Sequence, residues 1–160
     1  MPNATIRNYA REDYDAVIAL WGLFPDAFGV GRSDTREELE KKLARDPDLF
    51  LVAEDAGAVV GTVIGGFDGR RGLIYHLAAN PRPEYCGLGR TLMAEIERRL
   101  EAKGCIRAYL LVLPENRRLV NYYTHLGWEA MEITTMAKNL GSNGCGASVS
   151  TKECRPADRC

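Results

Sequence analysis

The sequence predicts an α/β (α+β) domain in which a mixed, twisted β-sheet is flanked by helices. Strand-like and helix-like segments alternate along residues 5–138, in the order strand, helix, helix, three strands, helix, strand, helix, strand. Over residues 72–113 a strand, a glycine turn, a helix and another strand follow one another, which is the pattern of a parallel crossover unit. A length of 160 residues suits one domain with a substantial core.

The first third of the chain predicts one short strand and two helices. Residues 5–8 form the strand, and residues 25–31, with one proline and two glycines, form an irregular loop. Asp34, three residues before Glu37, predicts the N-cap of the second helix, which ends before Pro47. The first helix presents one apolar face, made by Tyr14, Val17, Ile18 and Trp21.

The middle of the chain predicts three consecutive strands. Residues 50–54 and 58–67 are two strand-like runs, and the short segment Asp55-Ala56-Gly57 joins them as a hairpin. Residues 72–79 form a third run, which ends at Asn80-Pro81.

A glycine turn leads directly into the third helix, in the stretch EYCGLGRTLMAEIERRL. Gly87 and Gly89 precede the apolar positions Leu92, Ile96 and Leu100, which recur every fourth residue. The first N–H groups of a helix have no partners in the helix, so this turn suits an anion. Three further elements are predicted: a strand over residues 107–113 buried on both faces, a helix over 115–125 and a last strand over 133–138.

Composition and charge limit the function classes. The chain has 21 basic and 22 acidic residues, a net charge of −1, so no general field attracts nucleic acid or an anionic membrane. No apolar run reaches transmembrane length, and the first residues lack the apolar core of a signal peptide. We therefore expect a cytoplasmic protein with no membrane or nucleic-acid partner.

The cysteines do not predict a metal site or a disulfide framework. There are five cysteines and two histidines, with no Cys-x-x-Cys pair. Three of the cysteines lie in residues 141–160, which are rich in Gly and Ser and show no periodicity. We expect residues 1–140 to form the domain and residues 141–160 to be a disordered tail.

Three separated segments resemble the GNAT superfamily of acyl-CoA-dependent N-acetyltransferases, in particular its small single-domain bacterial members. LFLVAEDAGAVVGTVIGGFDG is similar to the central hairpin of that family, and LAANPRPEYCGLGRTLM to its pyrophosphate loop. PENRRLVNYYTHLGW carries the most specific match, at Asn116, Tyr123, Gly127 and Trp128. The resemblance implies a GNAT fold, with a sheet of about six or seven strands and about four helices.

The resemblance also implies acetyl-CoA as cosubstrate and the residues that hold it. The loop and helix start would bind the pyrophosphate, and the end of the strand at residues 77–79 would pair with the pantetheine arm. For Asn116, a contact to the pantetheine amide and a helix cap are equally open. The implied cofactor contacts are Leu77, Ala78, Ala79, Tyr85, Cys86, Gly87, Leu88, Gly89, Arg90, Thr91, Asn116 and Tyr123.

Tyr123 matches the tyrosine that, in the family, supplies a proton to the departing thiolate, so it is the predicted general acid. The residue that accepts the amine proton is not evident. By strand alternation His76 lies opposite Leu73 and Tyr75, which favours packing over catalysis for it. Tyr75, Glu54 and Asp68 remain candidates that would act through a water.

One residue departs from the family pattern. Glu84 stands where the loop motif usually has Gln or Arg, and Arg82 or Arg90 would have to neutralise it. The leading hypothesis is an N-acetyltransferase acting on a primary amine of a small molecule, a protein N-terminus or a lysine. The alternative is a non-catalytic acyl-CoA-binding or sensing module. A homodimer is compatible with the sequence, which determines neither the oligomeric state nor the acceptor.

Overall fold

The computed structural model describes residues 4–25, 30–113 and 115–140. The chain divides into two compact units, Met1–Trp128 and Glu129–Cys160, and all the helices and strands described lie in the first. The predicted tail, residues 141–160, lies outside the described residues. No helix in the described ranges is both long and apolar enough to cross a membrane.

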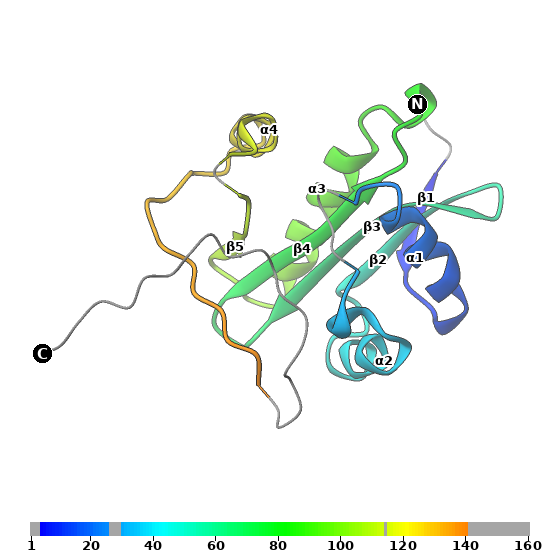
Figure 1. Cartoon of the computed structure of the whole chain (residues 1–160), viewed down its shortest axis with the longest axis horizontal. Helices are drawn as coiled ribbons and strands as arrows, with labels where there is room; N and C mark the ends of the chain where they lie inside the picture. Colours follow the sequence, from blue (N-terminus) through cyan, green and yellow to red (C-terminus); the bar gives the residue numbers. More distant parts are fainter. Residues whose placement is uncertain (1–3, 26–29, 114, 141–160) are drawn as a thin grey trace, which may run out of the picture. The chain divides into compact units, whose positions relative to one another are not determined.

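The first unit is built on one mixed five-stranded sheet with the order β1-β2-β3-β4-β5 (Figure 1). The first four strands run antiparallel to their neighbours, and β5 is parallel to β4 because α3 crosses over between them. This confirms the predicted α/β class and the crossover unit. The strands are β1 (Thr5–Asn8), β2 (Phe50–Asp55), β3 (Ala58–Phe67), β4 (Gly72–Ala79) and β5 (Ala108–Leu110).

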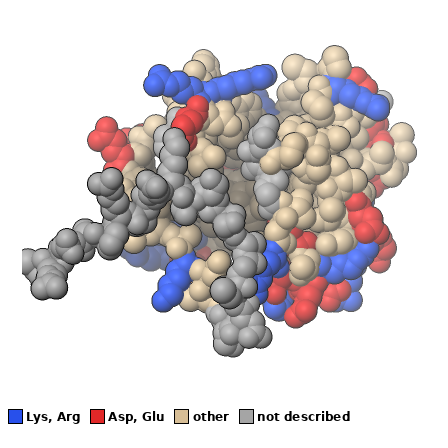
Figure 2. Space-filling view, viewed as in Figure 1, with Lys and Arg blue, Asp and Glu red and all other residues tan. Residues whose placement is uncertain are grey.

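Within the described residues, four α-helices and three short 3-10 turns accompany this sheet. The helices are α1 (Tyr14–Trp21), α2 (Arg36–Arg45), α3 (Leu88–Ala102) and α4 (Arg117–His125). The 3-10 turns are η1 (Arg11–Asp13), η2 (Arg32–Asp34) and η3 (Pro83–Tyr85). Figure 2 shows acidic and basic side chains mixed at the lower right, where α2 lies. Within this helix Lys41 pairs with Glu38.

The two faces of the sheet carry two separate cores, as the helix patterns predict. On one face α3 buries Leu92, Ile96 and Leu100 against the sheet. On the other face α1 and α2 bury Val17, Trp21 and Leu39 together with side chains of β2 and β3. Helix α3 approaches β3 closely, because a Cβ atom at Gly61 would lie 2.8 Å from Leu92 Cδ1.

The sheet has fewer strands than the six or seven expected. Residues 133–138, the predicted last strand, take no strand conformation, and Ile133 and Met136 are exposed. An alternating apolar pattern favours a strand only where a neighbouring strand takes up its backbone groups. The predicted strand over residues 107–113 shortens to β5, and Leu111 and Leu113 are exposed rather than buried.

The predicted cap of α2 is shifted by one residue. Thr35, not Asp34, is the N-cap, and its Oγ1 accepts a hydrogen bond from the Glu38 N–H at 3.3 Å. Asp34 belongs to η2, where its Oδ2 accepts from the Gly31 N–H at 2.8 Å. Both residues have a glutamate three positions later, so the spacing that predicts a capping box cannot distinguish them.

Candidate active site

The centre of the site is a β-bulge in β4 that the sequence does not predict. Thr62 of β3 pairs with Ala78, whereas Ile64 pairs with Tyr75, so β4 holds one extra residue between these pairs. His76 lies in this bulge with a φ of 52°, in the left-handed region that few non-glycine residues adopt. The Thr62 hydroxyl donates to the His76 carbonyl oxygen at 3.1 Å and accepts from Trp21 Nε1 at 2.9 Å.

The bulge overturns the prediction that His76 lies opposite Tyr75. An extra residue in a strand breaks the alternation of side chains, so Tyr75 and His76 lie close together, with ring centroids 5.5 Å apart. The His76 ring also packs against Trp21 of α1, with centroids 4.3 Å apart. Its Nε2 atom lies 3.2 Å from Asp34 Oδ1. Burial lowers the pKa of His76, and the charge of Asp34 opposes that shift.

The bulge is followed by an open strand edge. Pairing between β4 and β5 ends at Ile74 and Leu110, so within the described residues β5 does not pair with the rest of β4. The predicted pantetheine contacts Leu77, Ala78 and Ala79 lie in this part of β4, and β3 occupies only its other edge. Unpaired backbone groups on a strand edge can bind an extended ligand that carries amides.

The start of α3 provides an uncapped helix N-terminus. Gly87 is the N-cap with a φ of 89°, and as a glycine it has no side-chain oxygen to cap the helix. The N–H groups of Gly87, Leu88, Gly89 and Arg90 therefore lack intrahelical acceptors and can bind an anion. The Thr91 hydroxyl donates to the Gly87 carbonyl oxygen at 3.3 Å rather than facing outward.

The side chains of the loop before α3 differ in whether they can reach a ligand. Leu88 is buried against the sheet, so only its backbone can reach a ligand, whereas Cys86 is exposed. The Tyr85 hydroxyl donates to Asp55 Oδ2 at 3.1 Å, which ties the loop to the β2–β3 turn. Glu84, the departure from the family pattern, is exposed and lies 3.9 Å from Arg82 Nη1, measured from its Oε1.

Helix α4 carries the predicted acid. Tyr123 is 9% exposed, contacts the Tyr122 ring edge-on, and burial raises its pKa to about 12. Asn116 caps the helix, because its Oδ1 accepts from the Leu119 N–H at 3.1 Å. Asn116 therefore has the capping role, and its contact to the pantetheine amide stays a prediction.

Two contacts join α4 to α3, and sequence reasoning missed both. A Cβ atom at Gly89 would lie 3.1 Å from the Tyr122 hydroxyl, so Tyr122 reaches the start of α3. Trp128 Nε1 donates to Glu97 Oε1 at 2.9 Å and fixes the chain just after α4. No sequence pattern could have identified these partners, because they are far apart in the chain; Trp128 and Glu97 are separated by 31 positions.

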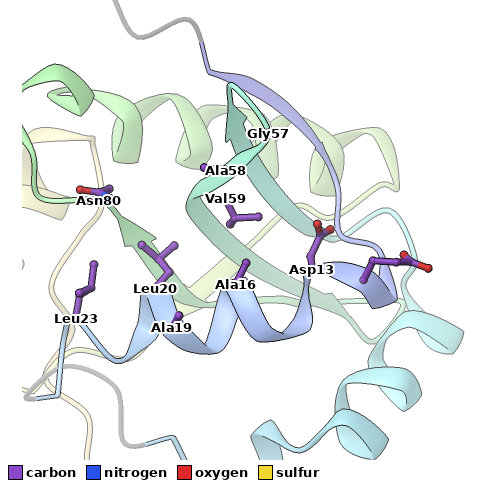
Figure 3. Close-up of a pocket in the computed structure, with 10 residues that line it drawn as sticks. Asp13, Ala16, Ala19, Leu20, Leu23, Gly57, Ala58, Val59 and Asn80 are labelled. Atoms are coloured by element: carbon purple, nitrogen blue, oxygen red, sulfur yellow. The ribbon is translucent and has the colours of Figure 1, made fainter.

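A cavity of about 480 Å³ lies apart from these features, between α1 and the β2–β3 hairpin (Figure 3). Leu20 of α1 and Leu23, just after this helix, line it, as do Val59 of β3 and Asn80, just after β4. It includes none of the predicted cofactor contacts, and Asp13 at its acidic end is held by Arg7 at 2.7 Å. We do not assign the cofactor to it.

Two further points concern a possible metal site and the loop over residues 25–31. Among residues 4–25, 30–113 and 115–140, no group of His, Cys, Asp and Glu side chains could hold a metal ion. The predicted irregular loop over residues 25–31 includes residues 26–29, which lie outside the described residues.

The sequence matches a known family over most of this unit. The model of the Acetyltransferase (GNAT) family matches residues 14–128. This chain is a GNAT acetyltransferase family member. Acetyl transfer is therefore its general activity, and the predicted resemblance is confirmed.

Curated relatives of this GNAT protein are named acetyltransferases. One from Pectobacterium atrosepticum is 37% identical over 137 residues, which cover 84% of this chain and 94% of the relative. Another, from Sodalis glossinidius, is 37% identical over 138 residues with the same coverage.

Solved structures agree on the GNAT fold. The PaiA N-acetyltransferase of Thermoplasma acidophilum, in complex with coenzyme A, has a TM-score of 0.72 and 19% identity over 82% of this chain and 93% of its own. Glucosamine-6-phosphate N-acetyltransferase from Arabidopsis thaliana has a TM-score of 0.65 and 18% identity over 85% and 98% of the two chains. At these identities the likeness establishes the fold alone.

Proposed function

We propose that this GNAT protein moves the acetyl group of acetyl-CoA to a primary amine by direct attack. The acceptor is a small molecule, a protein N-terminus or a lysine. Acetyl-CoA supplies a thioester carbonyl, and the chain supplies binding, alignment and proton transfer.

The observation that carries this proposal is the uncapped start of α3 beside the open edge of β4. The N–H groups of residues 87–90 can hold a pyrophosphate, although the chain has a net charge of only −1. The edge at residues 77–79 can pair with the amides of a pantetheine arm. The two surfaces follow one another along the chain, as an extended cosubstrate requires.

Tyr123 is the proposed general acid. Its raised pKa, about 12, keeps the phenol protonated at neutral pH, so it can donate a proton to the departing sulfur. Its ring is held between Tyr122 and Trp128, with centroid distances of 5.2 and 6.4 Å. Within the described residues its hydroxyl makes no hydrogen bond that would compete with this role.

The test combines calorimetric titration of acetyl-CoA with a thiol-release assay on an amine panel. Tyr123→Phe is expected to lower kcat by about 10²-fold while the Kd for acetyl-CoA stays the same. Tyr9→Phe is the matched control, because Tyr9 is equally buried, also has a pKa raised to about 12, and lies on the other face of the sheet.

The same experiment separates the two functions that the sequence predicts. Tight binding of acetyl-CoA without turnover of any amine would favour the non-catalytic acyl-CoA-binding module. Failure to bind acetyl-CoA at all would contradict both. Retained turnover in Tyr123→Phe would remove this residue from the mechanism but not the acetyl transfer.

A further inference from the structure

The acceptor amine must lose a proton before it attacks, because an alkylamine with a pKa of about 10 is protonated at neutral pH. The structure removes the three candidates for this role that the sequence left open. Burial raises the pKa of Tyr75 to about 12, so it does not ionise at neutral pH. Glu54 is paired with Arg7 at 2.7 Å, and Asp68 accepts from the Arg70 and Arg71 amides at the far end of β4.

His76 has the geometry of a held base. It immediately precedes the strand edge at residues 77–79, and its ring lies on the sheet face covered by α1, opposite α3. Its side chain is 21% exposed, so it is reachable although mostly buried. A left-handed φ at a non-glycine residue is a strained conformation, and such strain is concentrated at functional sites.

Asp34 places a carboxylate beside that base. Its side chain is 6% exposed, and Oδ1 lies 3.2 Å from His76 Nε2, an ion-pair contact that is not aligned as a hydrogen bond. Its other oxygen accepts from the Gly31 N–H at 2.8 Å, and its carbonyl oxygen accepts from the Tyr14 hydroxyl at 3.1 Å. With Nε2 toward a carboxylate, Nε2 carries the hydrogen, and Nδ1 is the ring nitrogen that can take up a proton.

We propose that His76, oriented by Asp34, accepts the proton of the acceptor amine. This assignment rests on the proposed acetyl transfer and adds its missing base. His76 is then a catalytic residue, and Asp34 is a positioning residue that stabilises the imidazolium formed.

The proton balance of the step is complete. The ammonium loses one proton to His76 Nδ1, directly or through one water, and His76 later releases that proton to solvent. As the C–N bond forms and the C–S bond breaks, Tyr123 gives its proton to the sulfur. The nitrogen loses a second proton, which restores Tyr123. No oxidant, reductant or further reactant is needed.

The charged surroundings of His76 set the expected pH dependence. Asp34 of η2 is the charged group that acts on it directly, and the neutral Tyr75 adjoins it on β4. From α1, Tyr14 contacts the Asp34 carbonyl, and Asp46, at the end of α2, acts on the pKa of Tyr75. Because Asp34 raises the pKa of His76, its removal is expected to move the acidic limb of activity to lower pH.

Two variants test the assignment without disturbing the bulge. His76→Asn keeps a residue that tolerates positive φ but cannot take up the proton. Asp34→Asn keeps an oxygen for the Gly31 N–H and removes the charge. We expect His76→Asn to lower kcat/KM by about 10²-fold for an alkylamine and to abolish the acidic limb. Asp34→Asn should shift the acidic limb of the pH profile to lower pH and reduce the maximum kcat/KM.

Acceptors of different basicity separate catalysis from a structural defect. An aromatic amine is already neutral at pH 7 and needs no base for its first proton. With such an acceptor, the ratio of kcat/KM between the original protein and His76→Asn should therefore fall toward one. A deficit equal for alkyl and aromatic amines, or an unchanged pH profile, would overturn the assignment. Calorimetry with acetyl-CoA serves as the control for both variants, with a Kd expected to stay within about twofold of the original.

Failure of the base and failure of the proposed function give different results. If the unmodified chain acetylates amines and His76→Asn matches it at every pH, the base is wrong and acetyl transfer stands. If the unmodified chain binds acetyl-CoA and acetylates no amine, both are wrong. NMR gives an independent check, because the sequence has only two histidines, His76 and His125, so the His76 resonance can be assigned simply. The His76 resonance should titrate at a lower pH in Asp34→Asn, and an unchanged midpoint would overturn the role of Asp34.

Discussion

At the scale of single residues, Thr62 joins the sheet to α1 and fixes the bulge. Its side chain is fully buried, accepts from the Trp21 indole and donates to the His76 carbonyl. The Trp21 indole is buried and the His76 carbonyl is partly buried, so both groups need a hydrogen bond. One hydroxyl therefore holds the strained backbone of His76 and the aromatic ring that packs against it.

Thr62→Val tests these two hydrogen bonds, because valine has nearly the same shape without the hydroxyl. It leaves a buried indole N–H and a carbonyl without their partner, so we expect a loss of about 1–3 kcal/mol in the free energy of unfolding. Urea denaturation measures it. Thr5→Val on exposed β1 is the matched control and should change stability by less than about 0.5 kcal/mol. Equal stability of the two variants would contradict the role of Thr62.

At the scale of elements, the two positions at the start of α3 require glycine for different physical reasons. Gly87 has a φ of 89°, so a side chain there is strained even though a Cβ would meet no atom within 4 Å. Gly89 lies inside the helix, and there the constraint is the Tyr122 hydroxyl of α4. Gly87 allows the left-handed turn, and Gly89 allows the close approach of α4.

Alanine at the two positions should therefore separate stability from binding. Gly87→Ala is expected to cost about 1–2 kcal/mol in unfolding free energy through backbone strain. Gly89→Ala should cost little stability, because alanine favours a helix by up to about 1 kcal/mol over glycine. Its methyl group displaces Tyr122 at the proposed phosphate site, so we expect about tenfold weaker binding of acetyl-CoA. Thermal unfolding and calorimetry measure the two effects. Intact affinity in Gly89→Ala would argue against this site.

The junction of β1 and η1 depends on charge. Arg7 donates to both oxygens of Asp13 at 2.7 and 2.8 Å and also to Glu54. These hydrogen bonds, with one from the Ala10 amide, hold the pKa of Asp13 below its usual value although burial opposes the shift. A carboxylate with a lowered folded pKa stabilises the fold above its unfolded pKa and loses that effect as pH falls through the folded value.

Asp13→Asn should remove this pH dependence. At neutral pH we expect it to cost about 2 kcal/mol, the size of a hydrogen-bonded contact to a charged group. Below roughly pH 4, where Asp13 begins to protonate in the unfolded chain, the difference from the original protein should shrink. Urea midpoints measured at several pH values give the comparison. A difference that stays constant down to acid pH would show that the ion pair is not its cause.

At the scale of the whole molecule, the proposed cosubstrate would contact three separate elements. The phosphates would bind at α3, the arm would add to the edge of β4, and Tyr123 would contribute from α4. A ligand that binds the folded state alone stabilises it by mass action.

Acetyl-CoA should therefore raise the thermal stability of the whole chain. At about 100 times its Kd the expected gain is about 2.7 kcal/mol in unfolding free energy. Acetyl-pantetheine lacks the phosphates, so at the same concentration it should give a clearly smaller shift. Differential scanning calorimetry compares the two. Equal shifts from both ligands would contradict a pyrophosphate site at α3.

The patterns in the sequence identified most elements and the parts of the site that are local. The hairpin, β4 and the glycine turn before α3 occur where they are predicted, because each depends on neighbouring residues only. Residues 133–138 show the limit of such patterns, since a strand exists only where a partner strand pairs with it. The predicted N-cap of α2 is wrong by one residue, because Asp34 and Thr35 both have a glutamate three positions later.

By itself the sequence determined the α/β class, the crossover unit, the glycine turn at residues 87–89 and the family, because repeated apolar spacing and turn residues act locally. Only the tertiary structure decided that Tyr75 and His76 lie side by side, that Asp34 meets His76, and that Tyr122 reaches Gly89. Each of these contacts joins residues brought together by a bulge or by packing between elements. No local rule encodes such contacts, because they depend on where the backbone of a second element lies.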